Sequence, residues 1–457
     1  MSLTQRLRQR RTQVVGLILM TAALLLATTG CEPRLPAGNV IGEPGSASTL
    51  VGCDAADTFL TVTTDTHLDP TCTYTQGIEV VASDVTLDCR GARIVDVADN
   101  RPQGIHVHVP VGQDLTGVVV RNCFIEGFTN TIRVSRDGFR SLPAGAEYLD
   151  DVGDITIENN HLSRSRGSGI FINAYVTGVT IRQNSISEAG SVGVYLEAGS
   201  RDSTLSGNSI SHNGFATVKP EGTPENIGGT TVLTRQTGRE GIAIDGSSGN
   251  HIVGNNLGAN AAGGIFLYKN CGEYATQKPE SWWQRRYGAD DNLIEDNVIL
   301  AGPTGIWVGS RMAENQYFMD CSDPAYLSGA LTAVHLDHAE GNSIRNNRIG
   351  LVDNAIRVED DATTVTGNYI EADDPTDRGI LIGTKHRTEV LGRPVTGTVV
   401  TGNDVVGPDG IEAYGWVHGQ ESTTFADNTL NDSPATLEPG TQPTINPFLF
   451  VIKVWIP

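Results

Sequence analysis

Short apolar segments recur along most of the chain with a constant internal order. Each has two or three β-forming residues, two variable residues, an asparagine, one variable residue and an aliphatic residue, as in ITIENNHL (155–162) and VTIRQNSI (179–186). The pattern returns at 203–210, 250–257, 292–299, 342–349, 363–370, 398–405 and 423–430. Asn160, Asn184 and Asn208 are 24 residues apart. This period suits one turn of a β-solenoid and is too short for a propeller blade.

A second apolar strand lies between these segments and usually begins with glycine. It reads GIFINA at 169–174, GVYLEA at 193–198 and GIFLYK at 264–269. Alternation points isoleucine and leucine inward and the residues between them outward. The asparagine is expected at the bend between strands, because it tolerates left-handed backbone geometry and its amide can bond backbone groups. The pattern therefore predicts an all-β, single-stranded parallel solenoid of stacked coils.

The outward positions of the second strand form two columns when they are read coil by coil. The first column holds Arg133, Phe171, Tyr195, Ala243, Phe266, Trp307 and Arg357, and the second holds Asn173, Glu197, Asp245, Tyr268, Gly309 and Glu359. Neighbouring strands lie about 4.8 Å apart, so Glu197, Asp245 and Tyr268 are predicted to be adjacent. Two carboxylates this close raise one another's pKa or hold a cation, with calcium as the candidate; a solvated acidic strip is the alternative. The aromatic residues of the first column either stack on sugar rings or pack beneath loops.

Four long turns follow the second strand, whereas most turns at that place are very short. They span 137–154, 270–291, 311–341 and 385–397. Because they follow the same type of strand in different coils, they are expected to emerge from one edge of the solenoid. A fifth insertion, 215–239, leaves from the other turn. Loops held by a rigid scaffold commonly carry function, so this edge is the candidate site; sequence drift in tolerant surface loops is the alternative.

Charge narrows the classes of partner. The chain has 457 residues, a net charge of −21 and a pI near 4.8. A negative body repels phosphate backbones, so no nucleic-acid partner is expected. The long turns and their borders interrupt this acidity with basic and aromatic residues: Lys269, Trp282, Trp283, Arg285, Arg286, Arg311, Lys385, His386, Arg387 and Arg393. A cationic, aromatic rim predicts recognition of carboxylate- or sulfate-bearing sugars, and exposed basic loops without a ligand are the alternative.

The N-terminal residues have the features of an export signal. A basic stretch precedes an apolar segment from Val14 to Thr28, which is followed by Thr29-Gly30-Cys31. This ending resembles the lipobox of bacterial lipoproteins, which implies that residues 1–30 are removed and that Cys31 is lipidated. An ordinary signal peptide is the alternative. The expected location is the bacterial cell envelope, with a lipid anchor in the outer membrane.

Six cysteines follow Cys31, an even number that suits disulfides in an oxidising compartment. The favoured pairs are Cys53 with Cys72, Cys89 with Cys123, and Cys271 with Cys321. Zinc binding is the weaker alternative, because the chain has no Cys-x-x-Cys pair.

Residues 31–50, rich in proline, glycine and serine, are expected to form a flexible tether. The β-helix domain with its N-terminal cap is predicted at 51–446. The apolar tail at 447–457 is a candidate cap for the last coil, since an open solenoid end exposes strand edges.

The repeats resemble the right-handed parallel β-helix superfamily of pectate lyases, alginate lyases, mannuronan epimerases and periplasmic carbohydrate-binding relatives. The resemblance covers about residues 75 to 430 and implies a right-handed helix that acts on an acidic polysaccharide. Lys269 and the run Arg286-Tyr287-Gly288 are similar to the lysine and Arg-His-Gly motif of alginate lyases and chondroitinases in this class, with Tyr287 in place of histidine. The Asp-Pro-His-Asp and Asp-Pro-His-Glu signatures of mannuronan epimerases are absent from the sequence.

Three functional hypotheses follow. A polyuronate lyase or C5-epimerase would use Lys269 as base, Tyr268 as acid or alternative base, and Arg286 or Arg285 (or calcium held by Glu197 and Asp245) against the sugar carboxylate. A glycoside hydrolase would instead use Glu197 and Asp245 as its carboxyl pair. A non-catalytic lipoprotein would bind glycan through the aromatic and basic edge, with Phe171, Tyr195, Phe266, Trp307, Trp282, Trp283, Arg285, Lys385, His386 and Arg387 as contacts. Enzymatic function, with elimination or epimerisation first, is favoured.

Overall fold

The computed structural model describes residues 48–227, 230–236, 238–270, 283, 285–309, 325–328, 332–335, 339–441 and 449–452. Residues 48–457 form one compact unit. The predicted signal peptide, Cys31, nearly all of the tether and the Cys271–Cys321 pair lie outside the described residues. Among the described residues, no helix has the length and apolar character needed to cross a membrane.

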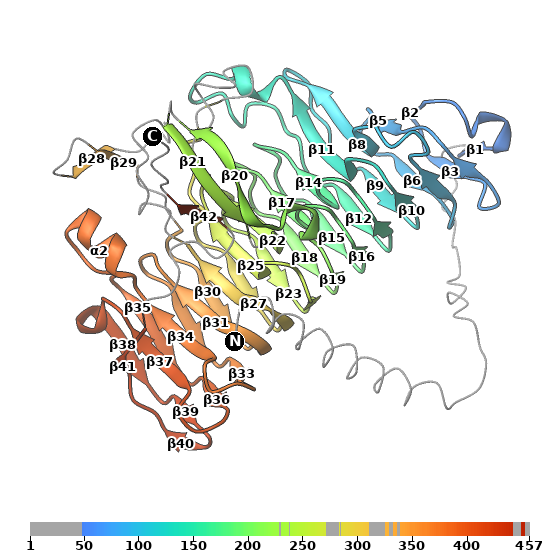
Figure 1. Ribbon diagram of the computed structural model, residues 1–457. Helices are drawn as coiled ribbons and strands as arrows, with labels where there is room; N and C mark the ends of the chain where they lie inside the picture. Colours follow the sequence, from blue (N-terminus) through green and yellow to red (C-terminus); the bar gives the residue numbers. More distant parts are fainter. Residues whose placement is uncertain are drawn as a thin grey trace, which may run out of the picture. The chain divides into compact units, whose positions relative to one another are not determined.

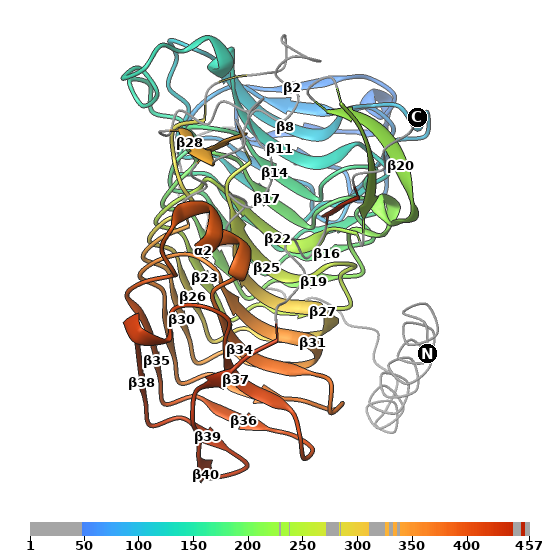
Figure 2. The ribbon, with the colours of Figure 1, turned by 60° about the vertical axis from the view of Figure 1, so that its left-hand side comes forward.

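Three sets of parallel strands wind into a right-handed parallel β-helix, as predicted (Figures 1 and 2). The first set consists of β1 (Thr49–Val51), β3 (Thr66–Leu68), β6 (Thr86–Asp88), β9 (Val119–Arg121), β12 (Thr156–Glu158), β15 (Thr180–Arg182), β18 (Thr204–Ser206), β23 (His251–Val253), β26 (Leu293–Glu295), β30 (Ser343–Arg345), β32 (Thr364–Thr366), β35 (Thr398–Thr401) and β38 (Thr423–Ala426).

The second set follows the turn that carries the repeated asparagine from Asn160 onward. It consists of β4 (Thr73–Tyr74), β7 (Arg93–Val95), β10 (Phe124–Glu126), β13 (His161–Ser163), β16 (Ser185–Ser187), β19 (Ser209–Ser211), β24 (Asn256–Gly258), the first parts of β27 (Val298–Val308) and β31 (Arg348–Val358), β33 (Tyr369–Glu371), β36 (Asp404–Val406) and β39 (Thr429–Leu430).

The third set carries the candidate site. It consists of β2 (Leu60–Val62), β5 (Ile78–Val80), β8 (Gln103–Pro110), β11 (Asn130–Asp137), β14 (Ile170–Ile172), β17 (Val194–Leu196), β22 (Glu240–Asp245), β25 (Gly263–Tyr268), the last parts of β27 and β31, β34 (Arg378–Ile382), β37 (Glu412–Trp416) and β41 (Glu438–Pro439). Because β27 and β31 run without a break through both sets, the second and third sets are joined into one sheet.

Shorter elements complete the described chain. They are the 3₁₀ helices η1 (Cys53–Ala55), η2 (Phe139–Ser141), η3 (Phe215–Thr217) and η4 (Gln420–Ser422), the helix α2 (Lys385–Leu391), and the strands β20 (Lys219–Ile227), β21 (Thr230–Gln236), β28 (Ala325–Ser328), β29 (Thr332–His335), β40 (Ser433–Pro434) and β42 (Leu449–Ile452).

The repeated asparagines form a buried ladder between the first and second sets. In each step the backbone N–H and the side-chain amide of one asparagine donate to Oδ1 of the next, at 2.9 and 3.1 Å from Asn184 to Asn208. The left-handed residue of the turn is the one before the asparagine, such as Gln183 with φ of 55°. The expectation of a left-handed asparagine is therefore wrong, while the expectation that its amide satisfies the turn is confirmed.

The glycine that opens the third-set strand allows close stacking of the coils. A Cβ atom on Gly193 would lie only 2.6 Å from the carbonyl oxygen of Gly241 in the next coil. A Cβ on Gly264 would similarly lie 2.5 Å from the carbonyl oxygen of Gly305. A side chain at either position would force neighbouring coils apart, which explains the recurrence of glycine there.

The 215–239 insertion contains the hairpin of β20 and β21, which leaves the coils between β19 and β22 (Figures 1 and 2). The four described residues of the apolar tail form β42, which pairs with β21 rather than with a strand of the last coil. The disulfides Cys53–Cys72 and Cys89–Cys123 are both present, as predicted.

Candidate functional site

The strand register confirms both outward columns of the third set. On successive coils it joins, in order, Arg133, Phe171, Tyr195, Ala243, Phe266, Trp307 and Arg357. In the second column Asp245 pairs with Tyr268, and the pairing of Leu196 with Ile244 places Glu197 beside Asp245. The coils therefore stack in phase, and residues far apart in sequence meet along one flank.

Glu197 is a buried carboxylate in the outward-facing row. Its Oε2 accepts hydrogen bonds from the Asn173 side chain at 2.6 Å and from the Ala174 backbone N–H at 3.2 Å. Nε of Arg133 donates to Oδ1 of Asn173 at 2.6 Å, so an amide links this cation to the carboxylate. Burial has the largest influence and raises the pKa of Glu197, although nearby arginines oppose the shift. A raised pKa makes the Glu197 carboxylate a stronger base than an exposed glutamate.

Tyr195 and Asp245 form a second hydrogen-bonded unit beside Glu197. The Tyr195 hydroxyl donates to Oδ2 of Asp245. Asn270 donates to Oδ1 of Asp245 through its backbone N–H at 2.5 Å and to Oδ2 through its side chain at 3.1 Å. Nη1 of Arg285 donates to the Asn270 carbonyl at 3.2 Å. Burial, reinforced by the charge of Asp245, raises the pKa of Tyr195 well above its usual value, so this phenol keeps its proton at neutral pH.

The aromatic part of the first column divides into an open half and a buried half. Phe171 and Tyr195 are half-buried and stack with ring centroids 4.9 Å apart. Phe266 and Trp307 are completely buried, in an edge-to-face contact with centroids 5.7 Å apart. The structure corrects the prediction for Phe266 and Trp307, because a completely buried ring offers no face to a sugar. Phe171 and Tyr195 keep exposed area and fit the predicted contact role.

Tyr268 and Lys269 are also buried. The Tyr268 hydroxyl donates to Oε1 of Glu240 and accepts from Nη2 of Arg239, both at 2.7 Å. Tyr268 is thus part of a buried ionic cluster, which corrects its predicted role as acid or base. Lys269 directly follows β25, and its side chain has no exposed surface, so in this structure it does not reach a substrate.

The first two predicted long turns meet beside the row of polar residues. Phe139 contacts Trp283 edge to face, with centroids 5.3 Å apart, and both rings are buried. Nη1 of Arg286 forms an ion pair with Oε1 of Glu147 at 2.6 Å. The two turns therefore contact each other and lie at the same edge of the solenoid, as expected from the sequence. Trp283 and Arg286 hold this wall together, a role that sequence reasoning did not assign to them.

The last predicted long turn contains α2 and is fixed by a buried arginine. Nη2 of Arg387 lies 3.0 Å from Oδ1 of Asp360 and 3.1 Å from Oδ2 of Asp361. Burial raises the pKa of Asp360 to about 6, and the charge of Arg387 opposes that shift. Arg387 is 1% exposed, so its predicted place on a sugar-binding rim is corrected to a buried ion-pair role.

The remaining rim residues are less informative. Lys385 is exposed, and its Nζ lies 3.6 Å from Oε1 of Glu389 on the same short helix. Trp282 and the side chain of His386 lie outside the described residues. The predicted basic rim is therefore reduced, among described side chains, to Lys385 and to arginines that already have partners.

The predicted calcium site does not fit the arrangement of Glu197 and Asp245. Ca²⁺ takes about six to eight oxygen ligands in proteins. Both oxygens of Asp245 accept hydrogen bonds, from Tyr195 and Asn270, and Oε2 of Glu197 accepts two more. These donors already satisfy three lone pairs of Asp245 and two of Glu197, so the chemistry proposed below is written without calcium.

Two histidines on β8 face outward at the near end of the same row, and sequence reasoning missed them. Nδ1 of His108 lies 2.6 Å from Oδ2 of Asp137, and its Nε2 lies 3.3 Å from Oε2 of Glu79. Nε2 of His106 lies 2.7 Å from Oγ of Ser135. Burial, with neighbouring positive groups, lowers the pKa of His106 to about 3. The signal was the His-Val-His-Val alternation within the strand, which places both imidazoles on one face.

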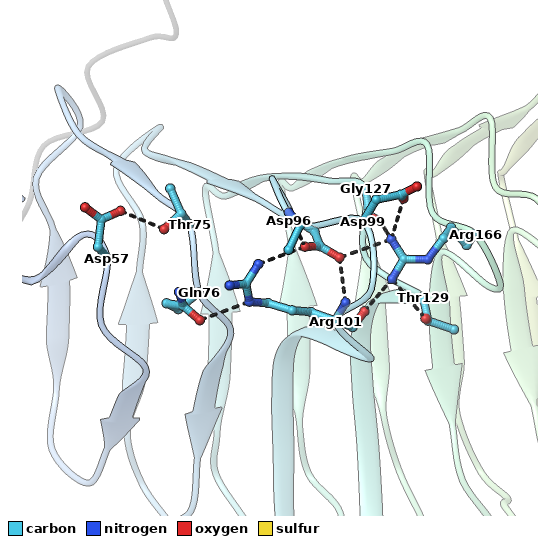
Figure 3. Close-up of polar contacts among 10 residues, drawn as sticks. Asp57, Thr75, Gln76, Asp96, Asp99, Arg101, Gly127, Thr129 and Arg166 are labelled. Atoms are coloured by element: carbon cyan, nitrogen blue, oxygen red, sulfur yellow. Dashed lines mark hydrogen bonds and ion pairs between the residues drawn. The ribbon is translucent and has the colours of Figure 1, made fainter.

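Another polar cluster, at the turns that follow the second set, has a structural role (Figure 3). Asp96 accepts from the guanidinium of Arg101 at 2.9 Å and from that of Arg166 at 3.1 Å. Arg166 also donates to Asp99 at 2.8 Å and to the carbonyl of Gly127. These groups satisfy one another and tie neighbouring coils together, so the cluster explains rigidity rather than binding.

Two family models match parts of the chain. The model described as "Right handed beta helix region" matches residues 116–277, and the one described as "Periplasmic copper-binding protein (NosD)" matches residues 234–441. None of the curated proteins matches the chain.

Several solved structures are similar to the chain at low identity. The A-module of the Azotobacter vinelandii mannuronan C-5 epimerase AlgE4 is 13% identical over 86% of this chain and 93% of its own, with a TM-score of 0.43. An alginate lyase from Paenibacillus sp. is 13% identical over 84% of this chain and 98% of its own, with a TM-score of 0.37. The catalytic unit of a GH87 α-1,3-glucanase from Streptomyces thermodiastaticus is 14% identical over 82% of this chain and 61% of its own, with a TM-score of 0.43.

The copper in the second family's description can be tested against the matched segment. Among its described residues, the group whose ligand atoms could share an ion is Glu340, Asp360 and Asp361. Arg387 binds both aspartates, and the group contains no imidazole or thiolate, the ligands that copper prefers. This group does not fit copper.

Proposed function

We propose, on the premise that the chain is a right-handed parallel β-helix, that it binds an acidic polysaccharide along the outward face of the third set of strands. There it would remove the proton next to a sugar carboxylate, as a polyuronate lyase or C5-epimerase does. One observation carries the proposal: Arg133, Asn173 and Glu197 form a hydrogen-bonded row that lies directly beside the Tyr195–Asp245 pair.

The row contains the three groups that this chemistry needs. A cation must neutralise the sugar carboxylate, a base must remove the C5 proton, and an acid must protonate the leaving oxygen. Arg133 supplies the cation, and its guanidinium lies 5.7 Å from the centre of the Phe171 ring, which offers a stacking face. Glu197, with its raised pKa, supplies the base. Tyr195 keeps its proton and supplies the acid.

These assignments replace those expected from sequence. Lys269, Tyr268 and Arg286 were the expected base, acid and cation, but the first two have no exposed surface, whereas Glu197 keeps 6%, and the third is paired with Glu147. Epimerisation would use the same residues and return a proton to C5 from the opposite face, so a single assay should detect both outcomes.

The test is proton NMR of the full chain with polyuronates in D₂O. We expect either unsaturated products or solvent deuterium at C5 with the chain length preserved. Glu197→Gln and Tyr195→Phe should each lower the rate by about 100-fold or more, as expected for loss of a general base or acid.

Matched controls lie on the second set of strands, away from the row. Tyr369→Phe and Glu371→Gln, both on β33, should leave the rate unchanged. Full activity in the Glu197 and Tyr195 variants would overturn the assignment. Binding without any change in the polymer would show that the face recognises glycan but does not catalyse.

Hydrolysis is the second candidate, favoured by the adjacency of two buried carboxylates. Glu197, with a raised pKa, could act as acid and Asp245 as its partner. New reducing ends without unsaturated products or deuterium exchange would select this mechanism.

Export with a lipid anchor is also proposed. The two disulfides support folding in an oxidising compartment. Cys31→Ala should prevent incorporation of labelled fatty acid and release the protein from membranes. Unchanged labelling and membrane association in this variant would contradict the proposal.

A further inference from the structure

Four polar side chains from three adjacent strands converge beside the proposed polysaccharide face. His106 and His108 come from β8, Asp137 ends β11, and Glu79 lies in the middle of β5. His106 pairs with Glu79 of β5 on one side and with Arg133 of β11 on the other. His108 pairs with Ser135, two residues before Asp137. Parallel stacking of three consecutive coils thus brings two imidazoles and two carboxylates to one place.

The geometry of this cluster is that of a chelating group. One ligand atom from each of His106, His108 and Asp137 can be chosen so that all lie within 4.8 Å of one another. The two imidazole rings are stacked, with centroids 3.8 Å apart and an angle of 8° between their planes. Because the two residues are two positions apart in an extended strand, both rings lie on the same side of the sheet. Binding an ion would therefore cost little further side-chain conformational entropy.

The cluster is also reachable from solvent and held by neighbouring groups. The side chain of His108 is 18% exposed and that of Asp137 is 47% exposed. Asp137 accepts from Ser135 at 3.0 Å, and Ser135 also contacts His106. Hydrogen bonds of this kind to the ligands orient metal-binding side chains in proteins.

We propose that His106, His108 and Asp137 form a binding site for a divalent transition-metal ion, with Glu79 as a fourth ligand or as the hydrogen-bond partner that orients His108. Two imidazoles and one or two carboxylates suit Zn²⁺ or Cu²⁺, whereas Ca²⁺ and Mg²⁺ prefer sites made of oxygen ligands alone. The site does not depend on the polysaccharide chemistry proposed above. It also lies outside the segment matched by the copper-binding family model, which begins at residue 234.

The test uses the full chain without a histidine tag. Zn²⁺ titration calorimetry should give one tight site, with Ca²⁺ and Mg²⁺ failing to compete. His106→Gln and His108→Gln should each abolish this site. Glu79→Gln should weaken binding by roughly 10- to 100-fold if Glu79 acts as an orienting partner.

His161 provides a matched control, because it is an exposed histidine that stacks on Phe124 of the second set. His161→Gln should bind Zn²⁺ like the unaltered protein. If His106→Gln and His108→Gln bind Zn²⁺ as tightly as this control does, the proposal is overturned.

A spectroscopic measurement on the unaltered protein guards against variants that fold poorly. With one equivalent of Cu²⁺, the electron paramagnetic resonance spectrum should show hyperfine coupling to two imidazole nitrogens. A spectrum without nitrogen coupling, or several weak Cu²⁺ sites in place of one, would also overturn the proposal.

Discussion

The asparagine ladder and the outward columns of the third set are both stacks that run from coil to coil, yet they differ in composition. The ladder repeats one residue, from Asn160 through Asn403 to Asn428. The columns change at almost every step, from Arg133 to Phe171 and Tyr195. A residue that repeats from coil to coil indicates a structural hydrogen bond that each of these coils requires. A residue that changes from coil to coil indicates a position that the fold does not constrain. This contrast supports the proposal that the chemistry lies on the columns, and it identifies the ladder as part of the architecture.

The columns themselves divide along the solenoid. Between β8 and β17 the first column is partly accessible, as at Arg133 and Phe171, whereas Asn173 and Glu197 of the second column are buried. Further along, Phe266, Trp307 and Tyr268 are completely buried and behave as a small second core. Column position alone therefore does not make a residue accessible, as the complete burial of Phe266 and Trp307 shows.

The largest expected effect is the loss of stability when a buried aromatic residue of the first column, rather than a partly exposed one, is replaced by alanine. Trp307→Ala should lower the free energy of unfolding by about 3–5 kcal/mol, because it empties a fully packed site. Phe171→Ala should cost only about 1–2 kcal/mol, since its side chain is only partly buried, and should weaken polyuronate binding by up to about tenfold. Urea denaturation and binding titrations of both variants check this. Equal losses of stability would remove the distinction between the two halves.

The next effect tests the ladder. The Asn208 side chain donates to the Ile181 carbonyl and to Asn255, and it accepts from Asn184. Asn208→Ala should cost at least about 3 kcal/mol, because each buried group left unpaired costs roughly 1–3 kcal/mol. Ser209→Ala, at the exposed neighbouring position, should change stability by less than about 0.5 kcal/mol. Denaturation midpoints of the two variants should differ accordingly; matching midpoints would count against a structural ladder.

The smallest effect concerns pH and Glu197. Because the folded protein raises the pKa of this carboxyl, its contribution to stability is fully present below the unfolded pKa and is lost as pH rises through the folded pKa. Glu197→Gln removes this loss, so the melting temperature of the variant relative to the unaltered protein should rise between pH 4 and pH 8. A difference that does not vary with pH would show that burial does not disfavour the charged form. Glu421→Gln, at an exposed position, is the control.

The sequence was sufficient to predict the coils, their register and two of the disulfides. Periodicity determines which residues point inward, and stacking in phase then determines which outward residues are neighbours, so the adjacency of Glu197 and Asp245 followed from counting. The left-handed position of the turn was misplaced by one residue: Gln183 has the positive φ, while the Asn184 side chain points inward and bonds the coils on both sides.

Burial of the outward residues could not be predicted in the same way. Trp307 packs with Phe266 and Tyr268 of the neighbouring coil, and the repeat makes these residues neighbours without determining that the group is completely buried. The partner of Arg286 comes from a distant coil and the partners of Arg387 from the neighbouring coil, so basic residues predicted to form a binding rim are held in ion pairs. His106 and His108 were visible in the sequence as an alternating pair, but their carboxylate partners became apparent only when β5, β8 and β11 were placed side by side.

Hydrogen exchange of the full chain with and without polyuronate oligosaccharides tests the central claim most directly. The account predicts that bound sugar slows amide exchange in β8, β11, β14 and β17 and in the turns beside them, while the second set of strands is unaffected. Protection confined to the second set, or no protection by any acidic oligosaccharide, would contradict the placement of the site on the third set.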